Sequence, residues 1–487
     1  MTSFAIRSVK HVARALLYGI TGGCAVLVIV FVLHLESRPD LKVWHTAELD
    51  AEFTAERSVR SFADYLVMEK RLFDQLDERV YSRVPPEDRG LASRYHRGSL
   101  SDPARWSPNW NRTFEHSTDG PRAGVLLLHG MSDSPYSLRS FGQRLNTEGA
   151  WVIGLRLPGH GTAPSGLVRV RWEDMDAAVQ LAVRRLHDKA GKGPLYIVGY
   201  SNGGALAVNY ALSSLENSGL PPVDGLVLIS PSIGVTSMAA MAKWQARLGR
   251  LLGLDKLAWS DILPEYDPFK YNSFAVNAGD QVYRLTTEIQ ARLKATDFAG
   301  KLNRFPKVLA FQSVVDATVS TSAVIKGMFA QLPAIGHELV LFDINHVARA
   351  EQLFKKNPGP EIAALLGDEH LLFTVSLVTN ESEESSEVVV RRKTPGSLKI
   401  TETPLGLKWP REIYSLSHVA LPFSIKDALY GGSPSGGNPG IRLGNMELRG
   451  ERGMLQIPAA DMLRLRWNPF YTYMERRLLE FVRLVES

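Results

Sequence analysis

A regular alternation of short apolar runs and longer amphipathic stretches, beginning at Ala123, constrains the fold more than any other feature of the sequence. The runs are AGVLLLH, WVIGLRLP, PLYIVGYS, GLVLISPS and KVLAFQS, and stretches such as RWEDMDAAVQLAVRRLHDKA separate some of them. Continuous apolar runs are typical of strands buried on both faces, and the amphipathic stretches have helical periodicity. The pattern predicts an α/β fold with a mostly parallel sheet covered by helices.

The N-terminus carries a long apolar segment. Residues 15–35 read ALLYGITGGCAVLVIVFVLHL and contain no Asp, Glu, Lys or Arg. At about 1.5 Å per residue, a helix of this length spans roughly 31 Å, close to the hydrocarbon thickness of a bilayer. Arg7, Lys10 and Arg14 precede the segment. The positive-inside rule therefore predicts a single-pass membrane protein with cytoplasmic residues 1–14 and the remainder on the far side, periplasmic or extracytoplasmic.

A cleaved signal peptide is the main alternative for this segment. The apolar stretch is long for a signal peptide, and no obvious small-x-small cleavage site follows it. The transmembrane interpretation of residues 15–35 is therefore favoured.

The rest of the chain divides into a helical part and a main domain. Residues 36–120 have helical patterning and are expected to form a stalk or linker, or a helix packed on the main domain, which covers 121–487. Within the main domain, residues 233–303 are helix-rich and are expected to form a cap. Residues 345–410 are expected to be an insertion, with a β-hairpin at 371–393 around an acidic, serine-rich turn.

Charge and cysteine content exclude some function classes. The chain has 56 basic and 51 acidic residues, a formal net charge of +5, and no dense Lys/Arg run, so nucleic acid is not an expected partner. The single cysteine, Cys24, cannot form an intrachain disulfide. The sequence leaves the oligomeric state open.

Ser201 stands in the segment YIVGYSNGGALAV, where an apolar run meets a small-residue stretch. Gly199, Ser201 and Gly203 form the pattern G-x-S-x-G at the junction of an expected strand and an expected helix. In such a turn the glycines avoid steric clash and the serine hydroxyl is exposed as a nucleophile. A purely structural strand–helix turn is the alternative interpretation.

A serine nucleophile also needs donors for the oxyanion that forms when it attacks a carbonyl. The segment LLLHGMSDSP follows an apolar run, and the backbone amide of Met131 is expected to act there together with that of Asn202. His129 is expected to hold this loop in place rather than to act as the base.

Five segments together resemble the α/β-hydrolases. They are LLLHGMSDSPYSLRSFGQRL, GLRLPGHGTAPSGL, RWEDM, IVGYSNGGALA and VVDATVS, and they cover residues 123–320. Within that superfamily the chain is similar to the monoacylglycerol lipase, carboxylesterase and serine aminopeptidase-like group. The resemblance implies an α/β-hydrolase fold with a cap, and a catalytic triad in the order Ser, Asp, His.

The resemblance implies that the acid is Asp316, in SVVDATVS after the run KVLAFQS. Asp343 in LFDINH is the rival. The base is implied to be His418, because REIYSLSHVALPF places a Ser-x-His-Val after a strand-like run. His337, His346 and His370 also follow the acid, and His346 is the next choice because compact members have the base soon after the acid.

These residues predict a membrane-anchored serine hydrolase that cleaves carboxylic esters through an acyl-enzyme. The expected substrate is a small-molecule or lipid ester, and no metal or organic cofactor is expected. Two alternatives stay open: a peptidase or amidase on the same scaffold, and a non-catalytic membrane-anchored interaction protein.

Overall fold

A mostly parallel sheet forms the centre of the molecule. The structure is a computed structural model that describes residues 2–57, 59–234, 254–295, 299–434, 440–445 and 454–486. Within these residues, ten strands form one sheet in the order β1-β3-β2-β4-β5-β8-β9-β10-β11-β12. The strands from β3 to β10 in this order run parallel, and β1, β11 and β12 are antiparallel to their neighbours. The predicted α/β class with a mostly parallel sheet is confirmed.

The strands of the central sheet and of a small separate sheet have the following bounds: β1 (Phe114–His116), β2 (Ala123–Leu128), β3 (Ala150–Leu155), β4 (Leu195–Tyr200), β5 (Gly225–Ile229), β8 (Lys307–Ser313), β9 (Glu338–Phe342), β10 (Thr374–Asn380), β11 (Glu387–Lys393) and β12 (Ile400–Lys408), with β6 (Trp259–Asp261) and β7 (Phe274–Ala275) in the separate sheet.

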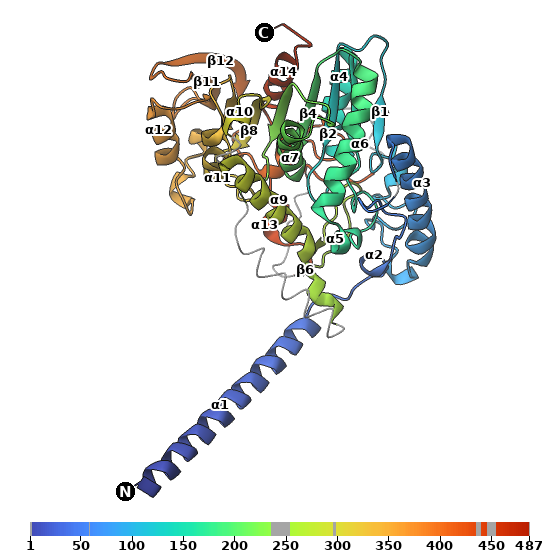
Figure 1. Ribbon diagram of the computed structural model, residues 1–487, viewed down its shortest axis with the longest axis vertical. Coiled ribbons are helices and arrows are strands. Elements are labelled where there is room, and N and C mark those ends of the chain that lie inside the picture. The colour runs from blue at the N-terminus through green and yellow to red at the C-terminus, as the bar shows by residue number, and fades with distance from the viewer. Residues whose placement is uncertain are drawn as a thin grey trace.

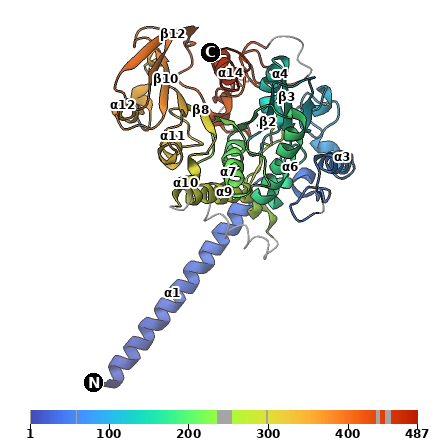
Figure 2. The same ribbon diagram turned by 45° about the horizontal axis from the view of Figure 1, so that its top comes forward.

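Helices cover both faces of the sheet, because successive residues of each strand point to opposite sides. In β4, Ile197 packs in a core with α6 (Trp172–Ala190), α7 (Asn202–Glu216) and α9 (Val276–Lys294). Its neighbour Val198 packs in a second core with α4 (Arg139–Thr147) and α14 (Tyr471–Phe481). Figures 1 and 2 show these helices around the sheet. The continuous apolar strands are therefore buried on both sides.

The first helix, α1 (Thr2–Glu36), extends away from the body in both views (Figures 1 and 2). Its stretch Leu16–Leu33 has a mean hydropathy of 2.5 and no buried residue, and it is long and apolar enough to cross a membrane. A signal sequence has the same properties, so length and composition alone fit both interpretations.

The chain after α1 packs on the body. Arg38 donates hydrogen bonds of 2.8 Å to the carbonyls of Lys256 and Trp259. Next come α2 (Val43–Thr46) and α3 (Phe62–Arg79), and α3 lies beside α6 (Figure 1). Ser61 caps α3 by accepting a hydrogen bond from the amide of Asp64. Five aromatic side chains between α2 and the end of α3 are buried: Trp44, Phe53, Phe62, Tyr65 and Phe73.

Two other segments were singled out in the sequence. The expected cap at 233–303 includes residues 235–253 and 296–298, which lie outside the described residues; its described part includes β6, β7, α9 and α10 (Ala299–Leu302).

The segment 345–410 contains α12 (Gly359–Gly367) and the strands β10 to β12. Because β10 pairs in parallel with β9, these strands continue the central sheet. That this segment is an insertion stays a prediction. The remaining short helices are α5 (Gly166–Arg169), α11 (Thr321–Gly327) and α13 (Ala459–Met462).

The packing of the N-terminal segment predicts different outcomes for two truncations. A chain that begins at Ser37 should unfold cooperatively, since Leu16–Leu33 contributes no buried residue and, among the described side chains, the truncation removes only one that is buried, Leu35. A chain that begins at Asp119 lacks the buried aromatic side chains of the N-terminal segment and should not fold. Each large buried side chain contributes about 1.5–3 kcal/mol, and the total stability of a protein is about 5–15 kcal/mol. Circular dichroism during thermal unfolding distinguishes them; equal melting temperatures would contradict this account.

Candidate active site

Ser201 lies on a strained turn between β4 and α7. Its backbone has φ 54° and ψ −116°, a conformation that L-residues rarely adopt. The turn is so tight that a Cβ at Gly203 would lie 2.1 Å from the carbonyl oxygen of Leu128, and one at Gly199 would lie 2.4 Å from the carbonyl oxygen of Gly203. Glycine is therefore required on both sides, and the serine is held at the carboxyl end of the sheet.

Asp316 and His418 are joined by a hydrogen bond. The distance from His418 Nδ1 to Asp316 Oδ2 is 2.8 Å, and both side chains are buried. Asp316 Oδ1 also accepts hydrogen bonds from the amides of Thr318, at 2.8 Å, and Val319, at 2.9 Å. Burial by itself raises the pKa of the Asp316 carboxyl, but the charge and hydrogen bond of His418 and these amides outweigh burial and lower that pKa below its ordinary value. The carboxylate is thus ionised and can orient the imidazole.

His418 lies next to the strand that carries Ser201. Ser313, the last residue of β8, donates a 2.8 Å hydrogen bond to the carbonyl of Leu416, which fixes the chain two residues before His418. The rings of Tyr200 and His418 are 5.2 Å apart, and the Tyr200 hydroxyl donates to the His418 carbonyl at 3.4 Å. Since Tyr200 directly precedes Ser201, the fold brings the predicted nucleophile, acid and base to one edge of the sheet.

The hydroxyl of Ser201 has a neighbour that the sequence analysis missed. Among the described residues, Ser201 Oγ is hydrogen-bonded to Ser232 Oγ at 3.3 Å. The amide of Ser232 also donates to the Ser201 carbonyl at 3.0 Å. Ser232 follows β5, the strand next to β4, so the strand order brings it to the same edge of the sheet as Ser201.

The loop after β2 lies against Ser201. A Cβ at Gly130 would be 3.2 Å from the Ser201 Cβ, so the backbones of the two turns approach closely. Within the described part of the chain, the Met131 amide donates to no protein acceptor. Asn202 is the first residue of α7, where amides lack an intrahelical acceptor. The role of the Met131 and Asn202 amides as oxyanion donors stays a prediction.

The rival residues have other partners. His346 contacts the carboxylates of Asp343 and Glu351, each at 3.1 Å, beyond the end of β9. His337 Nδ1 accepts a 3.1 Å hydrogen bond from the amide of Val308, and the side chain of His370 is 87% exposed. The structure pairs Asp316 with His418 and leaves these three histidines in separate environments.

Among the residues that the structure describes, no group of three or more His, Cys, Asp or Glu side chains is arranged to hold a metal ion. The expectation that the reaction uses no cofactor stays a prediction.

Comparison with known proteins gives matches over the central part of the chain. Residues 119–333 match the family model described as serine aminopeptidase, S33. A thermostable monoacylglycerol lipase from Bacillus sp. (strain H-257) is 27% identical over 178 residues, 37% of this chain and 67% of the relative. A structure from a study of LipS and LipT, two metagenome-derived lipolytic enzymes, has 20% identity and a TM-score of 0.38, covering 53% of this chain and 97% of its own. The monoacylglycerol lipase of Paleococcus ferrophilus has 20% identity and a TM-score of 0.36, covering 47% and 88%.

The parallel sheet, the strained serine turn after β4 and the family match identify the protein as a member of the α/β-hydrolase superfamily. Within it, the chain resembles the group that contains monoacylglycerol lipases and esterases. The matched region includes Ser201 and Asp316 but ends before His418. The family match therefore does not reach His418, and the structural observation that joins His418 to the site is its hydrogen bond with Asp316.

The environment of His346 predicts a pH-dependent contribution to stability. The hydrogen bond and charge of Asp343, with those of Glu351, raise the pKa of His346 above its ordinary value despite partial burial. A raised folded-state pKa gives stability that is fully present below about pH 6.5 and is lost as pH rises through the folded-state pKa. In urea unfolding, His346→Gln should therefore lower the free energy of unfolding by about 1 kcal/mol at pH 5.5 and by less at pH 9. An equal loss at both pH values would contradict this.

Proposed function

We propose that the protein hydrolyses carboxylic esters with Ser201 as nucleophile, His418 as base and Asp316 as the acid that orients it. The observation that carries this proposal is the buried Asp316–His418 hydrogen bond beside the strained turn of Ser201. The superfamily match supports it, since a serine in this turn is the usual nucleophile of the fold.

The proposed reaction proceeds in two steps. Ser201 Oγ exchanges its contact with Ser232 for one with His418 Nε2 and attacks the ester carbonyl while the imidazole takes its proton. The amides of Met131 and Asn202 stabilise the oxyanion, and the imidazolium, held by Asp316, protonates the leaving alcohol. Water then attacks the acyl-enzyme with His418 again as base, which releases the carboxylic acid.

We infer that the substrate is a small-molecule or lipid ester. The relative with 27% identity is named a monoacylglycerol lipase, which supports an acyl ester. The apolar part of α1 supports a location at a lipid surface, where the local concentration of such esters is high.

The family description favours amides as a second candidate class. It names a serine aminopeptidase, and the same triad chemistry cleaves amide bonds. Hydrolysis of amino-acid p-nitroanilides faster than of p-nitrophenyl esters would favour this candidate.

The triad assignment predicts the effect of three substitutions. Ser201→Ala, His418→Ala and Asp316→Asn should each lower kcat for p-nitrophenyl butyrate by about 10³-fold or more, because the three groups act as a unit. Ser201→Ala should also abolish labelling by a fluorophosphonate probe. The matched control is His346→Ala, which removes a histidine that also contacts carboxylates and should keep wild-type activity.

Two results would contradict the assignment. If His346→Ala is inactive and His418→Ala is active, the base is His346. If the folded wild-type protein neither reacts with the probe nor hydrolyses esters of any chain length, ester hydrolysis fails as the function.

We further propose that residues 15–35 anchor the protein, with residues 1–14 cytoplasmic and the hydrolase domain at 121–487 on the far side. The charges of Arg7, Lys10 and Arg14 support this orientation. The expected cap and the packed segment 36–120 would then lie on the far side as well.

The anchor predicts the behaviour of the chain in cells. The full chain should stay in the membrane fraction after carbonate extraction, and a chain that begins at Ser37 should not. Alkaline phosphatase needs disulfides to fold, so its fusion to the C-terminus should be active only on the oxidising side. An N-terminus beyond residue 35 in the purified mature protein would show a cleaved signal peptide instead.

A further inference from the structure

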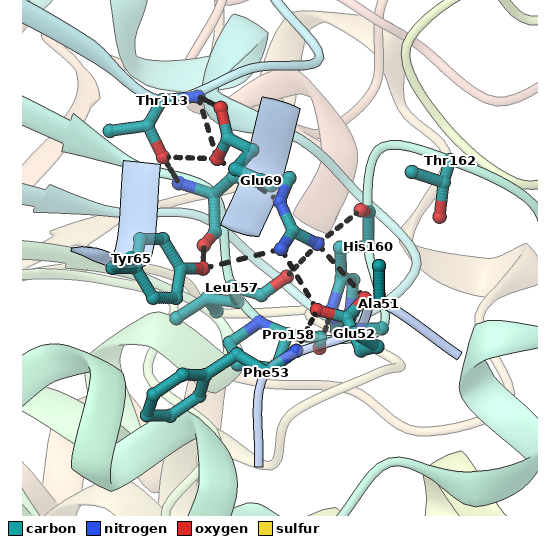
Figure 3. Close-up of polar contacts among 12 residues, drawn as sticks. Ala51, Glu52, Phe53, Tyr65, Glu69, Thr113, Leu157, Pro158, His160 and Thr162 are labelled. Carbon is teal, nitrogen blue, oxygen red and sulfur yellow. Dashed lines mark hydrogen bonds and ion pairs between the residues drawn. The ribbon is translucent and has the colours of Figure 1, made fainter. Parts of the chain in front are cut away.

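The loop after β3 contains a buried arginine bound by two carboxylates from the N-terminal segment. Arg156 forms a bidentate pair with Glu52, with distances of 2.8 and 3.1 Å, and its Nε donates to Glu69 at 3.1 Å. The Arg156 side chain is 1% exposed, and Glu52 and Glu69 are 21% and 5% exposed. Figure 3 shows Glu52, Glu69 and Tyr65 gathered around these contacts. The sequence analysis quoted Arg156 only as part of GLRLPGHGTAPSGL and did not predict its two glutamate partners.

This arrangement fixes the backbone of residues 156–160. The Arg156 guanidinium donates to the carbonyls of Leu157 and His160, at 3.3 and 3.0 Å. Glu52 also accepts a 2.9 Å hydrogen bond from the amide of Gly159, and the Tyr65 hydroxyl donates to the Arg156 carbonyl at 2.5 Å. The two glutamates therefore pair with the buried arginine and hold the loop that it organises.

The same loop fixes His129. The amide of Leu157 donates to His129 Nε2 at 3.1 Å, so Nε2 is unprotonated and the ring carries its proton on Nδ1. His129 Nδ1 then donates to the carbonyl of Gly130 at 2.8 Å. Burial, with the charge of nearby His160, lowers the pKa of His129 well below its ordinary value, so the ring stays neutral.

The Gly130 carbonyl and the Met131 amide belong to one planar, trans peptide group, so they point in opposite directions. Fixing the carbonyl on His129 therefore aims the Met131 N–H away from it. This is the amide that the proposed function assigns to the oxyanion hole. A continuous series of hydrogen bonds thus joins Glu52 and Glu69 to that amide.

We propose that Glu52 and Glu69 are positioning residues for the oxyanion hole, so that the segment following α1 forms part of the catalytic apparatus. This inference rests on ester hydrolysis at Ser201. It assigns the segment a role in the transition state, when negative charge develops on the substrate oxygen. Substrate binding in the ground state depends on it much less.

The test uses Glu52→Gln and Glu69→Gln in the full-length protein. Both should lower kcat about tenfold with KM within twofold, because an amide displaced from its best position stabilises the oxyanion less. Affinity for a trifluoromethyl ketone, which forms an oxyanion with the serine, should fall by the same factor as kcat/KM. Tyr65→Phe, which keeps the ring and removes one hydrogen bond, should give a smaller fall of the same kind.

The matched control is Glu338→Gln. Glu338 is a buried carboxylate that also pairs with arginine, at 2.7 Å to Arg477 and 3.2 Å to Arg392, and it starts β9 at the opposite end of that strand from the site. Its loss should lower the melting temperature and leave kcat unchanged. Kinetics are measured well below the melting temperature of each variant.

The outcomes separate the two proposals. If Ser201→Ala retains activity, the proposed function fails. If Ser201→Ala is inactive while Glu52→Gln and Glu69→Gln only lower the melting temperature and leave kcat unchanged, as Glu338→Gln does, the positioning role alone is overturned. If the glutamate variants do not fold, Tyr65→Phe decides: a fall in kcat and in ketone affinity at constant KM supports the role, and wild-type values overturn it.

Discussion

The candidate site depends on the hydrogen bond between Asp316 and His418, which are 102 residues apart in the chain. The bond forms because β8 ends just before Asp316 and the chain around Leu416 is held to the last residue of that strand. The chain between these two residues forms β9 to β12 and then returns to the edge of the sheet where Asp316 lies. The parallel sheet makes this possible, since the carboxyl ends of its strands, with the loops that follow them, meet at one edge.

The strain at Ser201 is the second constraint, and it is maintained by close packing. The turn admits only glycine at positions 199 and 203, and the loop after β2 lies within contact of the serine. A backbone in this conformation costs of the order of 1–3 kcal/mol and persists only where the surroundings determine it. The two apolar cores on either side of β4 supply that rigidity.

The N-terminal segment links these features to the region near α1. Two of its acidic residues, Glu52 and Glu69, pair with Arg156 inside the body. A buried cation with one partner removed is costly, so the segment and the loop after β3 stabilise each other. The part of the chain that joins the apolar helix to the hydrolase is therefore built into the fold.

The sequence by itself determined the fold class, the serine turn and the strand that precedes Asp316, because buried strands and tight turns leave local patterns of apolar residues and glycines. It also ranked His418 above His346, but only through a resemblance, since both histidines follow strand-like runs. Tertiary structure alone decided which histidine meets Asp316, placed Ser232 beside Ser201 and joined Glu52 and Glu69 to Arg156. These contacts connect residues far apart in the chain. A single charged or hydroxyl side chain has no sequence periodicity from which its partner could be predicted.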